Sequence, residues 1–277
     1  MAKGYYIMVD GLDGSGKGTV VSAFKEFFEK EGKKIFDLRE YWKENNDIPE
    51  IDEVMKYDVI CSAEPTFSMV GKVIREEMIR TNNRSYSGMS TAQAFALDRE
   101  ILYKKLLLPA KKEGKIIIQE RGITTSLVYQ PVQNEKIQLK EIINIPGNKL
   151  AIKNSPDALI IVNVEPEVAI ERLALREKKD DAIFENLVFQ RKVQRRFESD
   201  WMKKLFSHYD CKVIYLDTNP PLTVEDTKNK VVEICGELSD KKPVKENEKP
   251  VNEAESKAVG DEPPNVLPDG QSPEEDE

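Results

Sequence analysis

The sequence has few of the side chains that hydrolases and zinc proteins most often use. Its 277 residues include one histidine, His208, and three widely spaced cysteines, Cys61, Cys211 and Cys235, with no CxxC pair. A lone histidine disfavours Ser-His-Asp catalysis and a histidine-based metal site. An odd number of scattered cysteines argues against a disulfide framework or a zinc cluster, and it fits a reducing, cytosolic compartment.

Long apolar runs are also missing. The short apolar run near the N-terminus leads directly into a glycine-rich segment, so it does not have the form of a signal peptide. No run approaches the ~20 apolar residues that span a bilayer. Hydrophobic residues nevertheless make up 39% of the chain, which is enough to bury a core. We therefore expect a cytoplasmic globular protein with no membrane association.

The net charge of −8 is concentrated at one end of the chain. Residues 239–277 contain twelve acidic residues, five lysines, six of the fifteen prolines and no aromatic residue. Their net charge is −7, which leaves −1 for residues 1–238. A segment with so little apolar surface cannot offset the entropy lost on ordering. We predict one domain, residues 1–238, followed by a disordered acidic tail, residues 239–277.

Residues 1–238 alternate short apolar runs with helical patterns. The predicted strands are residues 5–9, 34–38, 115–119, 158–164 and 212–216. The predicted helices are residues 17–31, 68–80, 91–113, 166–176, 185–205 and 223–237, and residues 40–57 have the character of an insertion with one short helix. Nearly continuous apolar strands separated by helices predict a three-layer α/β fold, in which helices flank a parallel β-sheet.

A glycine-rich segment links the first predicted strand to the first predicted helix. Residues 11–19 read GLDGSGKGT and match the GxxxxGK portion of the P-loop pattern. Glycines let backbone N–H groups converge on phosphate oxygens, the helix N-terminus adds positive charge, and Lys17 reaches the terminal phosphates. The strict pattern has Ser or Thr where this chain has Gly18, and Thr19 follows instead. The segment predicts ATP binding through Gly11, Gly14, Ser15, Gly16, Lys17, Gly18 and Thr19.

Six further segments follow the loop in order. They are EPT (64–66), GKVIR (71–75), FALDR (95–99), ERGITTSLVYQ (120–130), PDALIIVNVEPEVAIER (156–172) and IFEN (183–186). With the loop, they give the chain a resemblance to the thymidylate kinase family of P-loop nucleoside monophosphate kinases, from about residue 3 to 237. The resemblance implies a P-loop kinase fold, phosphorylation of dTMP to dTDP, and ATP with Mg²⁺ as the phosphoryl donor. Members of this family are commonly homodimers, so a homodimer is the implied assembly.

The resemblance assigns acceptor-binding roles to several side chains. Phe95 and Arg99 are four residues apart on a predicted helix and therefore share a face. In the family, the matching ring and guanidinium contact the thymine base. Arg121 would bind the acceptor phosphate, and Ser126 and Tyr129 would contact the base and the 2′ position of the sugar.

Catalytic and metal-binding roles are implied in the same way. Asp13 would face the 3′-hydroxyl of the acceptor and metal-bound water, while Asp10 and Glu120 would hold Mg²⁺, through water. Residues 176–184 have the form of a mobile lid that excludes water from the reaction. The loop contains no arginine, so a cation must come from elsewhere. The candidates are Arg172, Arg176, Lys178 and Lys179, of which Arg176 is favoured. The implied catalytic set is Lys17, Asp13, Glu120, Arg121 and Arg176.

Three positions differ from the family pattern. Glu64 matches the Glu of the family's Arg-Glu-Pro and is assigned to acceptor binding, but Ala63 occupies the Arg position. One contact to the acceptor phosphate is therefore missing or supplied elsewhere, with Arg75 as the best candidate. Residues 120–122 read ERG where the family usually has Asp-Arg-Tyr. Glu120 thus has a longer reach than Asp, and Gly122 lacks the ring that would form a pocket wall.

Two other functions stay open from the sequence. In a deoxynucleoside kinase the acceptor would be a hydroxyl group, which needs a carboxylate base, and Asp10 would be the candidate. FALDR and IFEN favour a monophosphate acceptor instead. Alternatively, the chain is a catalytically weakened nucleotide-binding regulatory protein whose acidic tail binds a partner. Nucleic-acid binding is disfavoured because no stripe of clustered basic and aromatic residues occurs.

Overall fold

The structure, a computed structural model, describes residues 4–80, 82–133, 137–175 and 186–239. Its centre is a parallel six-stranded sheet with the order β2-β3-β4-β1-β5-β6. The strands are β1 (Tyr6–Gly11), β2 (Ile35–Asp37), β3 (Val59–Ala63), β4 (Ile116–Glu120), β5 (Ala158–Asn163) and β6 (Lys212–Asp217). The predicted tail beyond Ser239 and the predicted lid, including Arg176, lie outside the described residues.

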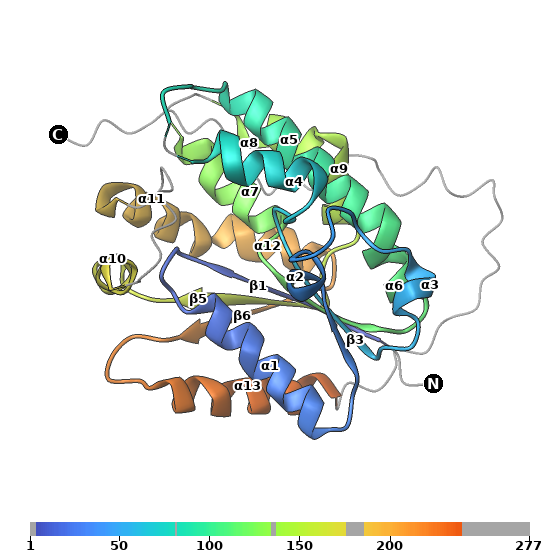
Figure 1. Ribbon diagram of the computed structural model, residues 1–277. Helices are drawn as coiled ribbons and strands as arrows, with labels where there is room; N and C mark the ends of the chain where they lie inside the picture. The colour runs from blue at the N-terminus through green and yellow to red at the C-terminus, as the bar shows by residue number, and fades with distance from the viewer. Residues whose placement is uncertain (1–3, 81, 134–136, 176–185, 240–277) are drawn as a thin grey trace.

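Helices and helical turns cover both faces of this sheet (Figure 1). They are α1 (Lys17–Lys30), α2 (Leu38–Tyr41), α3 (Ile51–Val54), α4 (Met69–Val73), η1 (Ile74–Met78), α5 (Gly88–Leu102), η2 (Tyr103–Leu107), α6 (Leu108–Lys112), α7 (Ile123–Tyr129), η3 (Gln130–Val132), α8 (Leu139–Asn144), α9 (Pro146–Lys153), α10 (Pro166–Ala174), α11 (Leu187–Phe197), α12 (Asp200–His208) and α13 (Val224–Ser239). None of the described helices is both long enough and apolar enough to cross a membrane.

Two apolar clusters hold the layers together, one on each face of the sheet. Helices α1 and α13 pack on one face and bury Phe24, Phe28 and Ile234 against the strands. The opposite face is covered by α5 to α9, α11 and α12, and it buries residues such as Leu106 and Phe206. Because β1, β3 and β5 are buried almost throughout, their near-continuous apolar sequences fit a sheet covered on both sides. The predicted three-layer α/β fold is confirmed.

Several element predictions were wrong in detail. Strand β3 was missed because its five residues, VICSA, are short and include Ser and Ala, which are weak strand formers. The predicted helix 185–205 is two helices, because Ser199 adopts an extended conformation and starts α12. The predicted helix 91–113 begins earlier, at Gly88, and contains the π-helical turn η2. The predicted helix 68–80 is α4 followed by the π-helical turn η1.

The predicted insertion, residues 40–57, is part of the packed core. It contains the end of α2 and the whole of α3, so it has two short helices where one was expected. Trp42, Ile48 and Val54 are buried in the same cluster as Leu38. Together with β2, which extends the sheet beyond β3, this segment forms one edge of the domain. It therefore holds α2 in a fixed place beside the carboxyl ends of the strands.

Candidate functional site

The carboxyl ends of the central strands open into a cavity of about 670 Å³. Parallel α/β sheets bind ligands at this edge. The predicted site residues that line the cavity are Asp13, Gly14, Gly16, Lys17, Gly18, Thr19, Glu64, Arg75, Phe95, Glu120, Arg121, Ser126 and Tyr129. Asp10, Gly11, Ser15 and Arg99 are buried behind its wall. Arg176 lies outside the described residues.

The glycine loop has the backbone geometry of an anion cradle. Gly14 and Gly16 have φ angles of 85° and 93°, in the left-handed region that favours glycine. A Cβ on Gly14 would lie 2.4 Å from the carbonyl oxygen of Ala169, so the loop packs too closely on α10 for any side chain there. Gly16 caps α1, and the N-terminus of that helix faces the cavity. This arrangement favours the binding of phosphate.

Lys17 is the cation of this cradle. Its side chain is only 6% exposed, and its Nζ donates to the carbonyl oxygens of Leu12 and, at 3.2 Å, of Gly11. Burial, and next the positive charge of Arg121, lower the pKa of Lys17 to about 8, although Asp13 and Asp10 oppose the shift. Without a bound anion, the positive charge of this buried lysine is therefore only partly balanced by its neighbours.

ATP affinity is expected to fall as the pH rises above about 8. Phosphates bind the charged lysine, so in that range binding must take up a proton, and the affinity drops by up to ~10-fold per pH unit. The folding stability of the ligand-free protein changes in the opposite direction. Between about pH 8 and 10.5, Lys17 holds more protons in the unfolded chain than in the folded one, so its contribution to stability rises with pH. Calorimetric titration with ATP in buffers of different ionisation enthalpy measures both the affinity and the proton uptake.

Lys17→Arg supplies the control for this pH dependence, because arginine keeps its charge throughout the range. Its ATP affinity should vary less between pH 7 and 9.5 than that of the wild type. An equally flat profile in the wild type would contradict the lowered pKa.

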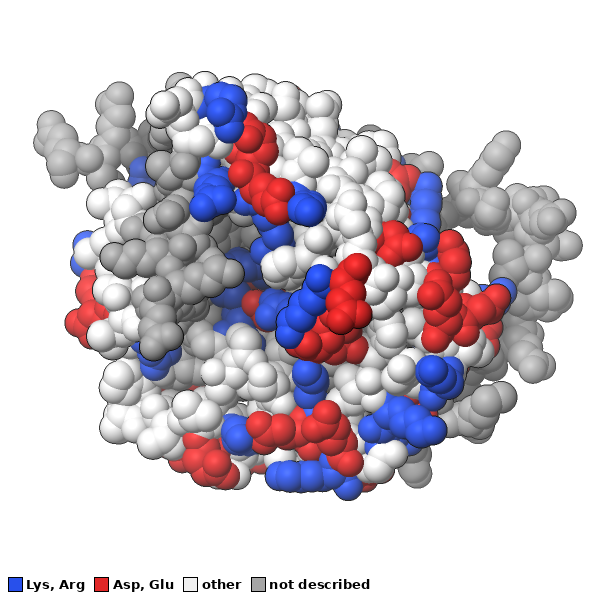
Figure 2. Space-filling view, in the orientation of Figure 1, with Lys and Arg blue, Asp and Glu red and all other residues white. Residues whose placement is uncertain are grey.

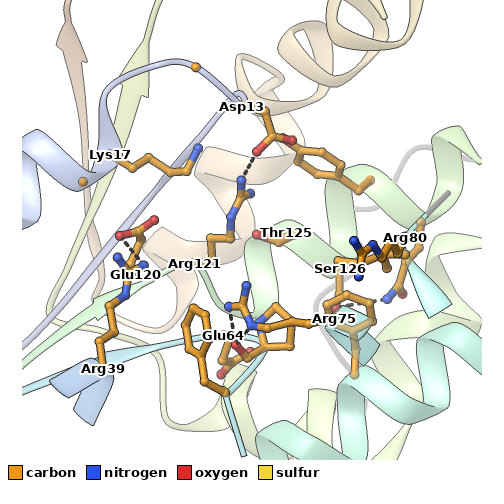
Figure 3. Close-up of a pocket in the computed structure, with 18 of the residues that line it drawn as sticks. Asp13, Lys17, Arg39, Glu64, Arg75, Arg80, Glu120, Arg121, Thr125 and Ser126 are labelled. Carbon is orange, nitrogen blue, oxygen red and sulfur yellow. Dashed lines mark hydrogen bonds and ion pairs between the residues drawn. The ribbon is translucent and has the colours of Figure 1, made fainter. Parts of the chain in front are cut away.

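Arg121 links the end of β4 to the phosphate loop. It has a φ angle of 62°, and its backbone N–H donates to Val9 O at 2.8 Å. Its guanidinium donates to Asp13 Oδ1, and the Tyr129 hydroxyl lies 3.3 Å from Asp13 Oδ2 (Figure 3). Burial disfavours the charge on Asp13, but Arg121 and then Lys17 outweigh it and lower the pKa of this carboxyl. Asp13 thus stays ionised and holds Arg121 over the cavity.

Two carboxylates emerge at the same edge of the sheet and could hold a divalent cation. Val9 pairs with Glu120 in the β1–β4 register, so Asp10 follows directly beside Glu120. The carboxylate of Asp10 accepts hydrogen bonds from Gly11 N and from the hydroxyls of Thr124 and Thr125. No group of three His, Cys, Asp or Glu side chains suited to a metal occurs among the described residues. Mg²⁺ needs no such group, since it is usually held by one or two carboxylates, water and substrate phosphates. Glu120 lines the cavity and therefore fits direct contact with Mg²⁺, whereas the buried Asp10 could act on the ion only through water.

A buried ion pair supports the far wall of the cavity. Arg99 is fully buried, and its Nε and Nη2 lie 2.8 and 2.7 Å from Glu64 Oε2. Glu64 Oε1 accepts from Gln119 at 2.7 Å. Burial raises the pKa of Glu64 to about 7, even though Arg99 favours its ionised form. Arg99 also donates to Asn148, and it fixes Ser126 through a 3.1 Å bond to its hydroxyl.

Three aromatic side chains, Phe67, Phe95 and Tyr129, line the cavity at different places. Tyr129 lies beside Asp13 of the loop, whereas the guanidinium carbon of Arg75 lies 3.7 Å from the centre of the Phe67 ring. Arg75 is held in place by hydrogen bonds from its Nε to Pro65 O at 2.9 Å and to Thr66 O at 3.1 Å. An aromatic ring on the wall, such as that of Phe95, suits stacking with a flat nucleobase.

Among the cavity-lining residues to which no role was assigned from the sequence are Arg39, Phe67 and Thr125. Arg39 forms an ion pair with Glu120, with 2.6 Å between Nη2 and Oε2. A signal for Arg39 was available, because it follows the predicted strand 34–38, and strands of such sheets end at the ligand edge. No comparable signal marked Phe67, since strand β3 just before it was not recognised.

The cavity thus brings two groups of cations together. Lys17 and the start of α1 form one, and Arg75 and Arg39 form the other, while Arg121 reaches Asp13 of the loop from between them (Figure 3). In Figure 2, lysine and arginine side chains gather around the hollow on this face, while acidic and basic residues mix elsewhere on it. Such a site can bind two phosphate-bearing ligands side by side.

Comparison with known proteins agrees with this geometry. A family model of thymidylate kinases matches residues 49–231. The chain is 29% identical to a thymidylate kinase of Caldicellulosiruptor saccharolyticus, over 87% of this chain and 100% of that protein. It is 28% identical to a probable thymidylate kinase of Pyrococcus horikoshii, over 83% and 95% of the two chains. A thymidylate kinase of Lactobacillus helveticus is 26% identical over 83% and 94%.

The family model covers well over half of the chain, and the relatives are matched over nearly their full lengths. The sequence motifs, the parallel sheet and the cavity at the ends of its strands agree with that match. The chain belongs to the thymidylate kinase family.

Proposed function

We propose that the protein transfers the γ-phosphoryl group of ATP to dTMP, which gives dTDP and ADP. The observation that carries this proposal is the shared cavity, which is lined by the phosphate loop with Lys17, by Arg121 (Figure 3) and by the ring of Phe95. Donor and acceptor can therefore lie with their phosphates between two groups of cations. The relatives named above are thymidylate kinases or probable thymidylate kinases, which supports dTMP as the acceptor.

The chemistry needs positioning and charge neutralisation more than it needs a base. The phosphate oxygen of dTMP is already ionised, so it can attack the γ-phosphorus of ATP in line without losing a proton. Lys17 would stabilise the charge on the transferred group, and Arg121, held by Asp13, would orient the acceptor phosphate. Mg²⁺, held by Glu120 and, through water, by Asp10, would neutralise further charge on the phosphates when bound.

The base of the acceptor would lie against Phe95 on the wall of the cavity. Phe95 would stack on it, while Ser126 and Tyr129 would contact the base and the sugar. Arg99 lies behind Ser126 and holds it through the 3.1 Å hydrogen bond. It would reach the base only by exchanging one of its present bonds, so its first role in this proposal is to position Ser126. Arg176 remains the proposed source of a further cation during transfer.

Deoxynucleoside phosphorylation has less support. Its base would be Asp10, but this carboxylate is fully buried, does not line the cavity and already accepts bonds from Gly11 N, Thr124 and Thr125. A hydroxyl acceptor in the cavity would therefore have no direct path to it. A regulatory protein with weakened catalysis is the other alternative, and strong turnover would exclude it.

A coupled assay of ADP release tests the proposed function. Pure protein with ATP and Mg²⁺ is given each nucleoside monophosphate and, separately, thymidine. We expect dTMP to give the highest kcat/KM and thymidine to give no ADP above background. A preference for thymidine over dTMP would reject the monophosphate mechanism, and no acceptor-dependent ADP at all would favour the regulatory alternative.

We also propose that the protein is a cytoplasmic homodimer. Helices α4 and α5 pack against each other and carry exposed apolar side chains, Met69, Val73 and Leu97. Exposed apolar residues on neighbouring helices suit an interface between two copies. Light scattering after size-exclusion chromatography measures the mass of the particle and would reject the dimer if it gave a single chain.

A further inference from the structure

The segment between α1 and β3 delivers an arginine to the cavity. Asp37 ends β2 and caps α2, since its Oδ1 accepts the backbone N–H of Arg39 at 2.9 Å. Its Oδ2 lies 2.6 Å from Lys25 Nζ, which ties the cap to α1. Leu38, next in the chain, is fully buried. The two residues before Arg39 therefore anchor its backbone, and its side chain points from α2 into the cavity (Figure 3).

Arg39 lies beside the position where the family pattern has an arginine and this chain has Ala63. Strands β2 and β3 pair Asp37 with Cys61, so the chain reaches Arg39 at the level of Ala63. Ala63 in turn pairs with Glu120 of β4, and the Arg39 guanidinium is in an ion pair with the Glu120 carboxylate. A cation thus occupies this corner of the site although residue 63 is alanine.

The surroundings of Arg39 are those of an anion site. Its guanidinium carbon lies 5.8 Å from the centre of the Phe67 ring, and that of Arg75 lies 3.7 Å from the same ring. Burial, and then the positive charges of Arg39 and Arg121, lower the pKa of Arg75 to about 9. All three arginines line the same cavity, and like charges near one another cost free energy until an anion lies between them.

We propose that Arg39 is an acceptor-binding residue: it binds the phosphomonoester of the nucleoside monophosphate and replaces the cation that residue 63 does not supply. This inference rests on the proposed function. The guanidinium fork can give a phosphate two hydrogen bonds and still neighbour Glu120. Arg39 and Arg75 both lie beside the Phe67 ring, whereas Lys17 belongs to the phosphate loop that would bind ATP. Arg39 is therefore expected to bind the acceptor and not ATP.

Other cations at the rim fit this role less well. Lys72 is half-exposed and pairs with Glu76 on the same helical segment, at 4.0 Å. Arg80 is exposed at the end of its segment. Arg39 alone among these three is held against a carboxylate at the strand ends, with its side chain 40% exposed and so reachable by a ligand.

Direct binding and kinetics of Arg39→Ala test the proposal. A lost charge-assisted hydrogen bond to phosphate should raise the Kd and the KM of dTMP by about 10- to 100-fold. ATP and thymidine, which lack the acceptor phosphate, should bind within about twofold of the wild type. Arg39→Lys should lose less dTMP affinity than Arg39→Ala, because lysine keeps the positive charge although it lacks the two-pronged guanidinium group. Lys43→Ala is the matched control, since Lys43 lies near Arg39 but pairs with exposed Glu40 outside the cavity.

A rescue variant makes the test sharper. In Arg39→Ala/Ala63→Arg, the cation returns from the position used by the family, and dTMP affinity should recover at least in part. Equal losses for dTMP and thymidine in Arg39→Ala would overturn the proposal, because Arg39 would then only support the wall through Glu120. A loss in ATP affinity as large as that for dTMP would overturn it as well. Circular dichroism checks that each variant is folded. If the double variant does not fold, the comparison of dTMP with thymidine affinity in Arg39→Ala still tests the proposal.

The outcome separates this inference from the proposed function. If the wild type binds dTMP but does not phosphorylate it, the proposed function fails, and the binding comparison still tests Arg39. If dTMP is phosphorylated and Arg39→Ala leaves its KM unchanged, the proposed function survives and the role of Arg39 is rejected.

Discussion

Lys17→Met is expected to lower kcat for dTMP phosphorylation by about 10³-fold while the protein stays folded. Lys17 is the buried cation of the phosphate loop, and a preorganised charge at the transferred group is worth roughly this much. Methionine has a similar length and is apolar, so it should fill the same space. It also removes a charge whose burial lowers its pKa to about 8, so stability should not fall. Steady-state ADP release at saturating dTMP measures the loss.

Lys30→Met is the matched control, because it makes the same change at the exposed far end of α1. It should leave kcat within about twofold of the wild type. Near-wild-type turnover by Lys17→Met would show that the phosphate-loop assignment is wrong.

Glu64→Ala should be the most destabilising single substitution near the cavity, at about 3–5 kcal/mol of unfolding free energy. It would leave the Arg99 guanidinium fully buried without its carboxylate, and arginine cannot shed its proton to relieve the cost. Urea unfolding followed by circular dichroism measures the change. A loss below about 1 kcal/mol would contradict the prediction.

The reverse substitution, Arg99→Met, should cost less. Glu64 can take up a proton, and burial already raises its pKa to about 7. A carboxyl whose pKa is higher in the folded state than its usual 4.5 stabilises the protein fully below 4.5, and this stability is lost as the pH rises through the folded value. Arg99→Met removes the charge that favours the carboxylate, so its stability should fall more steeply than that of the wild type above pH 5.

Glu64→Ala/Arg99→Met completes the cycle and should be more stable than Glu64→Ala, because no buried charge is left. If the effects of the two single substitutions simply add, the ion pair is not the source of the loss. The same variants report on function, since Arg99 holds Ser126 at the wall of the cavity. We expect Arg99→Met to impair dTMP use more than ATP binding.

The parts of the site that lie close together in the chain were predictable from the sequence. The phosphate loop is such a case, because strand, glycines, lysine and helix are consecutive and local backbone geometry decides their arrangement. The parallel sheet followed from apolar strands that alternate with helices.

The contacts between distant segments could not be read from the sequence. The contact of Arg99 with the acceptor base stays a prediction, and the structure shows Arg99 bonded to Glu64, Asn148 and Ser126 behind the cavity wall. Residue 148 lies in α9, which was not predicted. Phe95 and Arg99 do lie one turn apart on helix α5, as their spacing predicted. That spacing could not show that the neighbours of Arg99 would be polar side chains from three other parts of the chain.

The sequence by itself determined the phosphate loop, the fold class and the family, because these depend on local motifs, on apolar periodicity and on the order of motifs along the chain. Only the tertiary structure decided which charges meet. Arg39 and Glu120 are far apart in the sequence, and so are Asp13 and Arg121. Their pairing depends on the strand order β2-β3-β4-β1, which brings the ends of these strands together. A hydrogen bond or ion pair acts over a few ångströms of space, whatever the separation along the chain, and composition and spacing carry no record of that distance.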